Sequence, residues 1–229
     1  MDLTDSEQRL SELAAATKYV LLDFDGPVCD LFGVLAPDVI AASLLDELEV
    51  IVGGPVDEEL ADLDDPLDLL DGVSEIYPEL TGRVDASVRE AEVDAAGLAP
   101  VTPGAVEFLQ ACAASGRPVA IVSNNGAEAV RALLELHELS GLVQHVEGRN
   151  PDPRLMKPDP TPLLQAMRAL GADPASTTMI GDSSSDILAA RAAAVEAIAL
   201  LTLAPDHSEQ PWVGDMDTLA ELFGAQSLP

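Results

Sequence analysis

The sequence predicts an α/β fold, a Rossmann-like core with a parallel sheet flanked by helices, for a chain of 229 residues. Short apolar runs bounded by turn residues alternate with alanine-rich stretches of helical spacing, and this alternation is typical of β–α–β units. The last third of the chain shows it most clearly, because it reads strand, helix, strand, helix, strand. A hydrophobic fraction of 48% is sufficient for one core with an insertion, or for two small domains.

Five apolar runs are candidate strands, and four segments between them are candidate helices. The strands are Tyr19–Leu22, Pro118–Val122, Val143–Glu147, Thr178–Ile180 and Ala197–Leu201. The helices are Pro103–Ser115, Ala127–Leu139, Pro160–Leu170 and Ser184–Ala193. Thr102 is expected to cap the first helix, because a threonine hydroxyl accepts from exposed N–H groups and Pro103 suits a first turn. Gly171 is positioned to end the third helix.

Residues 31–97 interrupt this rhythm and are interpreted as a small α-helical cap, with residues 1–30 and 98–229 forming the core. The insertion holds 18 acidic residues against two arginines, and apart from Val50–Val52 it has no compact β-branched run. Its leucines at positions 60, 63, 67 and 70 follow amphipathic helical spacing, interrupted by Pro66. A disordered acidic linker over Val56–Gly72 is the alternative, and the leucine spacing favours helices over it.

The acidity of the chain excludes several classes of function. There are 41 Asp and Glu against 11 Lys and Arg, a formal charge of −30, and such a field repels nucleic acid and anionic membranes. No apolar stretch reaches the roughly 18 residues needed to cross a bilayer. Cys29 and Cys112 are expected to be free thiols, and the N-terminal segment does not resemble a signal or transit peptide. We therefore expect a soluble, cytoplasmic protein.

The first candidate site is Leu22-Asp23-Phe24-Asp25-Gly26, at the end of the first predicted strand. Side chains at i and i+2 of an extended chain point the same way, so Asp23 and Asp25 converge beyond the carboxyl edge of the sheet, where open α/β folds bind ligands. Two neighbouring carboxylates repel unless a cation lies between them or one is protonated. The pattern indicates a metal site or an acid/base pair, with solvated turn acids as the alternative.

A second acidic motif, Gly181-Asp182-Ser183-Ser184-Ser185-Asp186, follows the fourth predicted strand. Asp182 ends the strand, and Asp186 lies one helical turn later on the same side. Capping of the next helix by Ser183 or Ser184 explains the same residues structurally, and both roles are compatible. If this strand lies near the first, four carboxylates meet at one sheet edge, an arrangement that a hard divalent cation such as Mg²⁺ stabilises.

Two further segments carry groups suited to an anion. Ser123-Asn124-Asn125-Gly126 follows the second strand, where a hydroxyl and backbone N–H groups near a helix start form an anion cradle, with ordinary turn formation as the alternative. Lys157, in Met156-Lys157-Pro158-Asp159-Pro160, is one of only two lysines in the chain. Its ammonium is a compact charge suited to a phosphoryl group, and an exposed loop lysine is the alternative.

Together and in order, these four segments resemble the haloacid dehalogenase-like hydrolase superfamily, and in particular its phosphoglycolate phosphatase-like branch. The resemblance covers roughly residues 18–30 and 98–203, with all four signature motifs at strand ends. It implies a Rossmann-like core, and residues 31–97 then look like the helical cap that this superfamily inserts after the first motif.

The resemblance also implies a role for each matched residue. Asp23 would be the nucleophile, Asp25 the general acid/base, Ser123 a hydrogen-bond donor to the phosphoryl group, and Lys157 a charge neutraliser. Mg²⁺ would be held by Asp23, the carbonyl of Asp25 and Asp182, with Asp186 in support through water or the lysine. An aspartyl phosphate would form and then be hydrolysed by a water molecule that Asp25 deprotonates.

Residues that contact the substrate are harder to identify from sequence. We expect them to be Gly26, Asn124 and Arg149. Arg83 and Arg89 are the only cations of the insertion, and surface solubility is favoured over substrate binding for both. Arg154 lies with Arg149 in the proline-rich loop before Lys157, although pairing with Asp152 would equally explain one of these two arginines.

One position departs from the superfamily pattern. The fifth residue of the first motif is usually Thr or Val, and here it is Pro27, which removes a backbone donor and fixes φ in the turn before the cap. We therefore expect Pro27 to restrict the flexing of this turn during cap closure and to lower the efficiency of catalysis without abolishing it. The presence of Asp25, which is absent in the dehalogenase branch, favours phosphoryl transfer.

The leading hypothesis is a Mg²⁺-dependent phosphatase acting on a small phosphorylated metabolite. A phosphosugar mutase that uses the same residues is the first alternative, and a non-catalytic binding module that retains the fold is the second. The sequence does not predict the individual substrate, because cap loops choose it, nor does it predict an oligomeric state.

Overall fold

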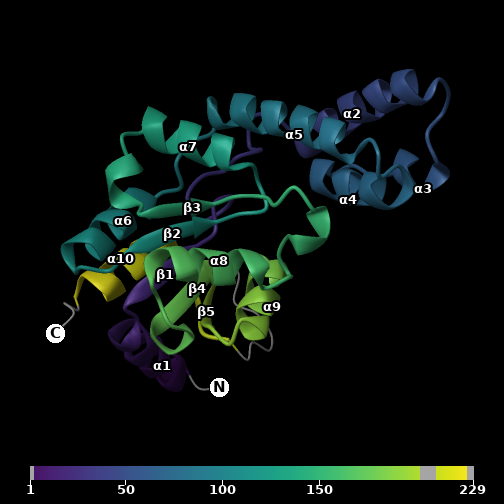
Figure 1. Cartoon of the computed structure of the whole chain (residues 1–229). Helices are drawn as coiled ribbons and strands as arrows, with labels where there is room; N and C mark the ends of the chain where they lie inside the picture. Colours follow the sequence, from purple (N-terminus) through teal and green to yellow (C-terminus); the bar gives the residue numbers. More distant parts are fainter. Residues whose placement is uncertain (1–2, 202–209, 226–229) are drawn as a thin grey trace.

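A single parallel sheet organises the computed structural model, which describes residues 3–201 and 210–225 (Figure 1). Its strands lie in the order β3-β2-β1-β4-β5-β6, and every neighbouring pair is parallel. They are β1 Tyr19–Leu22, β2 Val119–Val122, β3 His145–Glu147, β4 Thr177–Gly181, β5 Glu196–Leu200 and β6 Trp212–Val213. The strand order reverses direction at β1, and open sheets of this kind bind ligands at such a reversal, beyond the carboxyl ends of the strands. The predicted α/β class and parallel sheet are confirmed.

Each of the five predicted strands overlaps an observed strand. The largest difference is at β3, which begins at His145, two residues later than predicted. Gln144, just before it, binds the first residue of β2 through both its backbone and its side chain. Its N–H donates to the Val119 carbonyl, and its Oε1 accepts from Val119 N–H. The sequence analysis did not predict β6, a two-residue edge strand that contains Trp212.

Helices cover both faces of the sheet, as the alternation of side chains along the strands requires. Val20 and Leu22 of β1 belong to one buried cluster, and Leu21 belongs to the other. The first face is covered by α1 Leu3–Ala16, α6 Ala105–Ala114, α7 Ala127–Leu136 and α10 Met216–Gly224. The second face is covered by α8 Thr161–Leu170 and α9 Ser184–Ala192. Three short 3₁₀ turns, η1 Ser140–Leu142, η2 Pro153–Leu155 and η3 Pro174–Ser176, lie in the connections.

The start of α6 differs from the prediction. The helix begins at Ala105 and its N-cap is Gly104, whose φ of 82° and close approach to the backbone of Asp217 leave no room for a side chain. Thr102 is not the cap, because its hydroxyl instead donates to the carbonyl oxygen of Gly26 at 2.6 Å. The other predicted helix boundaries lie within a few residues of those observed, and Gly171 ends α8 in the left-handed conformation.

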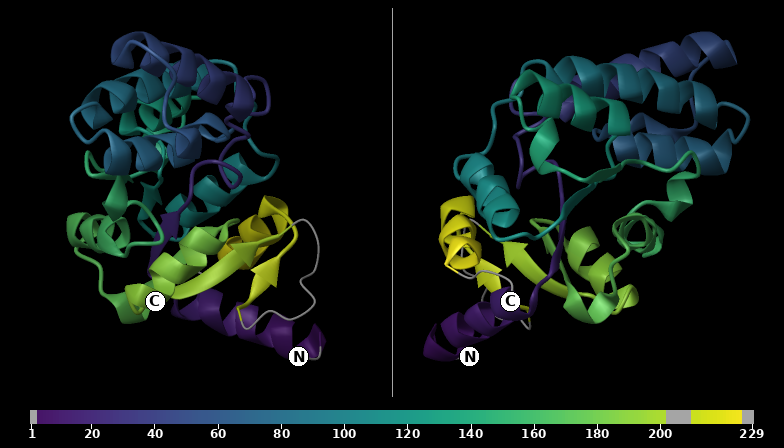
Figure 2. Two further views of the ribbon diagram at one scale, coloured as in Figure 1. Left: turned by 90° about the vertical axis from the view of Figure 1, so that its right-hand side faces the viewer. Right: turned by 60° about the vertical axis from the view of Figure 1, so that its left-hand side comes forward.

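The predicted insertion folds into helices that form a second lobe above the sheet (Figure 2). They are α2 Pro37–Val52, α3 Glu58–Ala61, α4 Pro66–Ile76 and α5 Thr81–Ala96. Pro66 begins α4 rather than interrupting one long helix, and Asp65 caps it by accepting from the N–H groups of Leu67 and Asp68. Val50–Val52 is the end of α2 and not a strand.

Helix α5 is shared between the two lobes. Val84 and Val88 pack in the buried cluster of the helical lobe, whereas Ala95 and Ala96 pack in the core cluster beside the sheet. The last turns of α5 lie along α7 (Figure 1). The predicted boundary between residues 97 and 98 therefore follows a helix that is already anchored in the core. Of the predicted core, residues 1–2, 202–209 and 226–229 lie outside the described residues.

No helix within the described ranges is both long and apolar enough to cross a bilayer.

One buried cation joins the helices on the first face. Arg117 is 2% exposed, and its guanidinium donates to the carbonyl oxygens of Thr17, Ala14 and Phe223 at 3.0, 3.3 and 3.2 Å. It also lies 5.4 Å from the centroid of the Phe223 ring. Burial lowers the pKa of Arg117. These bonds satisfy carbonyls at the ends of α1 and α10, where helices lack internal donors.

We expect Arg117→Leu to lower the free energy of unfolding by about 3 kcal/mol, because three buried carbonyl groups would each lose a donor worth about 1 kcal/mol. The measurement is denaturant unfolding followed by circular dichroism. Arg168→Leu, which removes an exposed arginine of α8, is the matched control and should cost about 0.5 kcal/mol or less. Equal effects of the two substitutions would show that the buried guanidinium does not join these helices.

Candidate active site

Three neighbouring strands end in polar side chains that share one cavity. Asp23 follows β1, Ser123 follows β2 and Asp182 follows β4, with β1 between the other two. The cavity has a volume of about 470 Å³. Asp25 and Lys157 also line it. The four sequence motifs therefore meet at one sheet edge.

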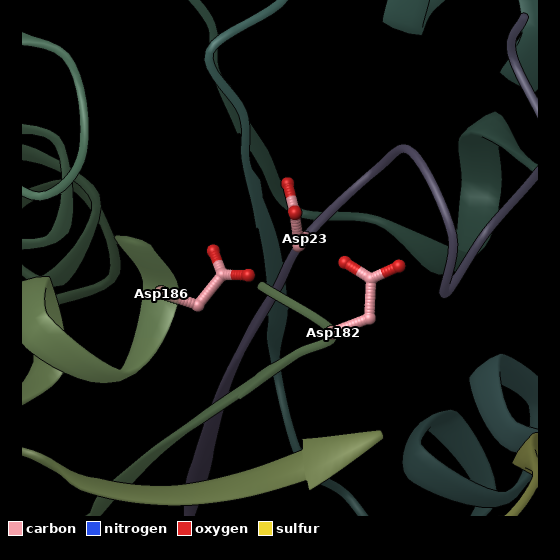
Figure 3. A group of neighbouring side chains, drawn as sticks. All are labelled: Asp23, Asp182 and Asp186. Atoms are coloured by element: carbon pink, nitrogen blue, oxygen red, sulfur yellow. The ribbon is translucent and has the colours of Figure 1, made fainter. Parts of the chain in front are cut away.

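Three carboxylates are close enough to share a metal ion. One carboxylate oxygen from each of Asp23, Asp182 and Asp186 lies within 4.8 Å of the other two (Figure 3). Carboxylate oxygens are the donors that Mg²⁺ and Ca²⁺ prefer. Gly26 makes room for this group, because its φ is 95° and a Cβ at that position would overlap the Asp182 carboxylate. The donor set thus fits a hard divalent cation.

Lys157 is buried between two of these acids. Its side chain is 2% exposed, and Nζ lies 2.7 Å from Asp23 Oδ1 and 2.6 Å from Asp186 Oδ1. The third N–H donates to the carbonyl oxygen of Val122 at 2.9 Å. All three donors of the ammonium therefore have protein acceptors, so the lysine acts on the cavity mainly through its charge.

The pKa values reflect competition between burial and these charges. Burial raises the pKa of Asp23 above its ordinary value, the charge of Asp186 adds to this, and Lys157 opposes both. Burial works against protonated Lys157, but Asp23 and Asp186 prevail and raise its pKa. Burial, followed by the charges of Asp186 and Asp25, raises the pKa of Asp182 to about 6. A cation at this site would favour the ionised carboxylates.

Asp186 has both carboxylate oxygens engaged. Oδ1 accepts from Lys157, while Oδ2 accepts from the backbone N–H and the hydroxyl of Ser183 at 3.1 and 2.7 Å. Ser183 in turn caps α9, so the capping role foreseen for this motif is confirmed. The arrangement suits Asp186 to holding the lysine and the helix start, with Asp23 and Asp182 as the more available metal ligands.

Asp25 is held at the mouth of the turn that follows β1. Its Oδ1 accepts from the N–H of Leu31 at 2.8 Å. Burial raises the pKa of Asp25 and this hydrogen bond lowers it, with a net rise that favours the protonated form. Pro27 lies in the same turn, where Gly26 N–H donates to the Cys29 carbonyl at 2.7 Å. A raised pKa is what a general acid requires.

The loop after β2 is braced by its own side chains. Ser123 is 1% exposed, and its hydroxyl donates to Asn125 Oδ1 at 3.0 Å. Asn124 makes two hydrogen bonds with the backbone of Lys157, at 2.8 and 2.9 Å. Both residues line the cavity, and Asn124 also aligns the lysine segment with this loop.

Arg149 corrects one prediction. It does not line the cavity, and its side chain is 0% exposed, because Nε and Nη1 pair with Asp85 and Glu92 of α5 at 2.7 and 2.6 Å. Nη1 also donates to the carbonyl oxygen of Asn124 at 3.0 Å. A side chain so enclosed holds the loop after β2 against α5 and does not reach a ligand in the cavity.

Glu92 is a site residue that the sequence analysis missed. It is 1% exposed, and besides Arg149 it accepts from Asn125 Nδ2 and Gly126 N–H at 3.1 and 2.8 Å. The helical lobe thus supplies a carboxylate to the loop that carries Ser123. Its position in the sequence could have indicated this, because residues 88, 92 and 95 share one helix face and Val88 and Ala95 are buried apolar residues. An acid on a buried face is expected to have a polar partner.

The remaining arginines considered from sequence pair with acids away from the cavity. Arg89 bonds Asp85 and Glu128, and Arg83 pairs with Glu47 on the surface of the helical lobe. Arg154, which has a 75% exposed side chain, pairs with Asp152, and this confirms the pairing considered from sequence for one arginine of this loop.

Comparison with known proteins identifies the family. Residues 17–194 match the family described as haloacid dehalogenase-like hydrolase. The chain is 35% identical over 130 residues to phosphoglycolate phosphatase 1 of Pseudomonas aeruginosa, an alignment that covers 57% of this chain and 46% of that protein. It is 33% identical to the probable phosphatase IndB of Dickeya dadantii, covering 70% of this chain and 73% of that protein. The chain spans only about half the length of the first of these relatives.

Solved structures agree on the fold. A HAD phosphatase from Thermococcus onnurineus superposes with a TM-score of 0.65 at 20% identity, covering 93% of this chain and 100% of that chain. At this identity the likeness speaks for the fold alone, whereas the family match extends over most of the sequence and includes all four motifs. The chain therefore belongs to the haloacid dehalogenase-like hydrolase family.

Proposed function

We propose that this protein is a Mg²⁺-dependent phosphatase that hydrolyses a small phosphorylated metabolite through an aspartyl-phosphate intermediate. The observation that carries the proposal is the grouping of Asp23, Asp182 and Asp186 around buried Lys157, in a cavity that also holds Asp25 and Ser123. The relatives named as phosphatases support the same activity.

Asp23 is the nucleophile in this proposal. Its Oδ1 is held by Lys157 and by the N–H of Phe24 at 2.7 Å each, whereas Oδ2 accepts no hydrogen bond from the described residues. Oδ2 attacks phosphorus, a P–O bond forms with Asp23, and the bond between phosphorus and the leaving alcohol oxygen breaks. Fixing one oxygen orients the other for attack in line with the leaving group.

Asp25 exchanges the proton in both half-reactions. In the first it donates a proton to the leaving alkoxide, and burial, which raises its pKa, favours that role. Once ionised, it accepts a proton from water, whose oxygen attacks phosphorus and releases phosphate and the Asp23 carboxylate. Lys157 offsets the negative charge on Asp23 and Asp186 in both half-reactions. Ser123 donates to a phosphoryl oxygen once its hydroxyl has rotated away from the hydrogen bond with Asn125 Oδ1.

A divalent cation would be held by Asp23 and Asp182, with the Asp25 carbonyl as a third protein ligand and Asp186 in support. When bound, it supplies positive charge that stabilises the negative charge on the transferring phosphoryl group. Asp23, Asp182 and Asp186 outnumber the one lysine and leave this edge negative, so an anionic substrate needs the charge of the cation to approach.

In this proposal residues 31–97 form a cap over the cavity. Phe32, Pro37 and Leu67 of that segment line the cavity together with the residues at the strand ends. Because the last turns of α5 are anchored in the core, closure would act mainly on α2, α3 and α4. The same proposal places the enzyme in the cytoplasm, with no nucleic-acid or membrane partner, because the charge of −30 disfavours both.

The test is release of inorganic phosphate from p-nitrophenyl phosphate and from a panel of phosphorylated metabolites. We expect turnover with Mg²⁺ and loss of turnover with a chelator, restored by added Mg²⁺. Activation by a bisphosphorylated sugar, with isomerised product in place of free phosphate, would support the mutase alternative. No turnover on any compound would support a binding module.

A further inference from the structure

The wall of the cavity that is formed by residues between positions 30 and 67 has a charge that bears on the leaving alcohol. The residues there are Asp30, Phe32, Pro37, Asp65 and Leu67. Two of them are acids and the other three are apolar. Among the described residues that line the cavity, Lys157 is the only cation, and its three donors are already bound by protein acceptors.

Every lysine and arginine of the sequence falls within the described ranges. The arginines nearest in sequence to the site or in the helical lobe are engaged elsewhere: Arg149 and Arg89 with acids of α5 and α7, Arg83 with Glu47, and Arg154 with Asp152. None of them lines the cavity. A carboxylate on the leaving alcohol would therefore find no lysine or arginine with a free donor among the described residues that line the cavity.

The two acids of this wall can accept hydrogen bonds. Asp65 uses Oδ1 to cap α4, at 2.7 Å from Leu67 N and 3.1 Å from Asp68 N, while Oδ2 accepts none from the described residues. Asp30 is exposed, and its carboxylate likewise accepts none from them. Both carboxylates line the same cavity as Asp23 and Asp25, so their negative charge acts on a group bound there.

We infer that the alcohol released from the substrate carries hydrogen-bond donors and no anionic group, as in a phosphorylated polyol or amino alcohol, and that Asp65 enforces this choice. The carboxylates of Asp65 and Asp30 accept from hydroxyl or ammonium groups, and Phe32 and Leu67 contact the carbon chain. This inference rests on the proposed phosphatase function and names its substrate class. It differs from the phosphoglycolate named for several relatives, whose alcohol bears a carboxylate.

Three substrates of nearly equal size isolate the charge. Phosphoglycolate, 2-hydroxyethyl phosphate and phosphoethanolamine end in a carboxylate, a hydroxyl and an ammonium group. With Mg²⁺ present, we expect kcat/KM for each of the last two to exceed that for phosphoglycolate by about tenfold or more, which corresponds to about 1.4 kcal/mol. Added salt should narrow the difference, since these charges are partly exposed.

Asp65→Asn tests the residue itself. Asparagine caps helices as well as aspartate does, so the substitution removes the charge and keeps the start of α4. We expect it to reduce the ratio of kcat/KM for 2-hydroxyethyl phosphate to kcat/KM for phosphoglycolate by about threefold or more. Asp57→Asn is the matched control, because Asp57 caps α3 in the same lobe and does not line the cavity. The ratio of the two kcat/KM values in this variant should equal that of the wild type. Asp30→Asn serves as a second variant if Asp65→Asn does not fold.

The outcomes separate the two proposals. Hydrolysis of p-nitrophenyl phosphate together with equal or better use of phosphoglycolate would overturn the substrate class and leave the phosphatase function standing. An unchanged preference in both Asp65→Asn and Asp30→Asn would overturn the role of this wall. Failure to hydrolyse p-nitrophenyl phosphate and all three substrates with Mg²⁺ would overturn the phosphatase function and the substrate class with it.

Discussion

Asp23→Asn is expected to lower kcat by on the order of 10⁴-fold or more, because an amide oxygen is a poor nucleophile and cannot form the aspartyl phosphate. The substitution is nearly isosteric in a site where Lys157 retains its bond to Asp186 at 2.6 Å, so the fold should be kept. Phosphate release under saturating substrate and Mg²⁺ measures the effect. Circular dichroism of the variant checks that the chain is folded.

A second readout separates nucleophilic loss from general damage to the site. Rapid acid quenching of the wild type during turnover should yield a phosphorylated peptide that contains Asp23, detected by mass spectrometry. The same peptide from Asp23→Asn should carry no phosphate. Full activity in the variant, or a phosphorylated peptide from another part of the chain, would contradict the assignment of Asp23.

Asp182→Asn is expected to reduce kcat/KM at fixed Mg²⁺ by about 100-fold or more, the scale of losing one strong electrostatic contact in a transition state. An amide oxygen carries no net charge, so a hard cation binds it more weakly than it binds a carboxylate. Asp182 is exposed and makes little contribution to the packed core. Part of the activity should return at high Mg²⁺, because the effect is on metal affinity.

The matched control for this experiment is Asp173→Asn. Asp173 is exposed and precedes β4, whereas Asp182 follows it, so the two carboxylates lie at opposite ends of one strand. Calorimetric titration with Mg²⁺ should give wild-type affinity for Asp173→Asn and weaker binding for Asp182→Asn. Equal Mg²⁺ affinity in the two variants would show that Asp182 is not a ligand.

The residues predicted most successfully from sequence share a local context. Asp23, Ser123 and Asp182 each follow a short apolar strand, and parallel strands bring their carboxyl ends to one edge of the sheet. The proximity of these side chains follows once the strands are recognised as neighbours. Their chemical roles remain proposals, and the substitutions above test those of Asp23 and Asp182.

Residues whose partners are distant in sequence could not be predicted in this way. Arg149 has the same local signal as an anion-binding loop arginine, yet it pairs with Asp85, 64 residues away. Thr102 has a strong signal for a helix cap, but its hydroxyl donates to the carbonyl oxygen of Gly26 and the helix begins later, after Gly104. In both cases a tertiary contact overrides the local preference.

The amino-acid sequence by itself determined the α/β class, the helical insertion and the acids at the strand ends, because hydrophobic periodicity and strand–turn–helix motifs are local properties. Only the tertiary structure decided which charges meet. It buried Arg149 between α5 and the loop after β2, brought Glu92 to Asn125, and placed Asp65 in the same cavity as Asp25. Electrostatic interactions depend on distance and burial, and neither is encoded in the spacing of residues along the chain.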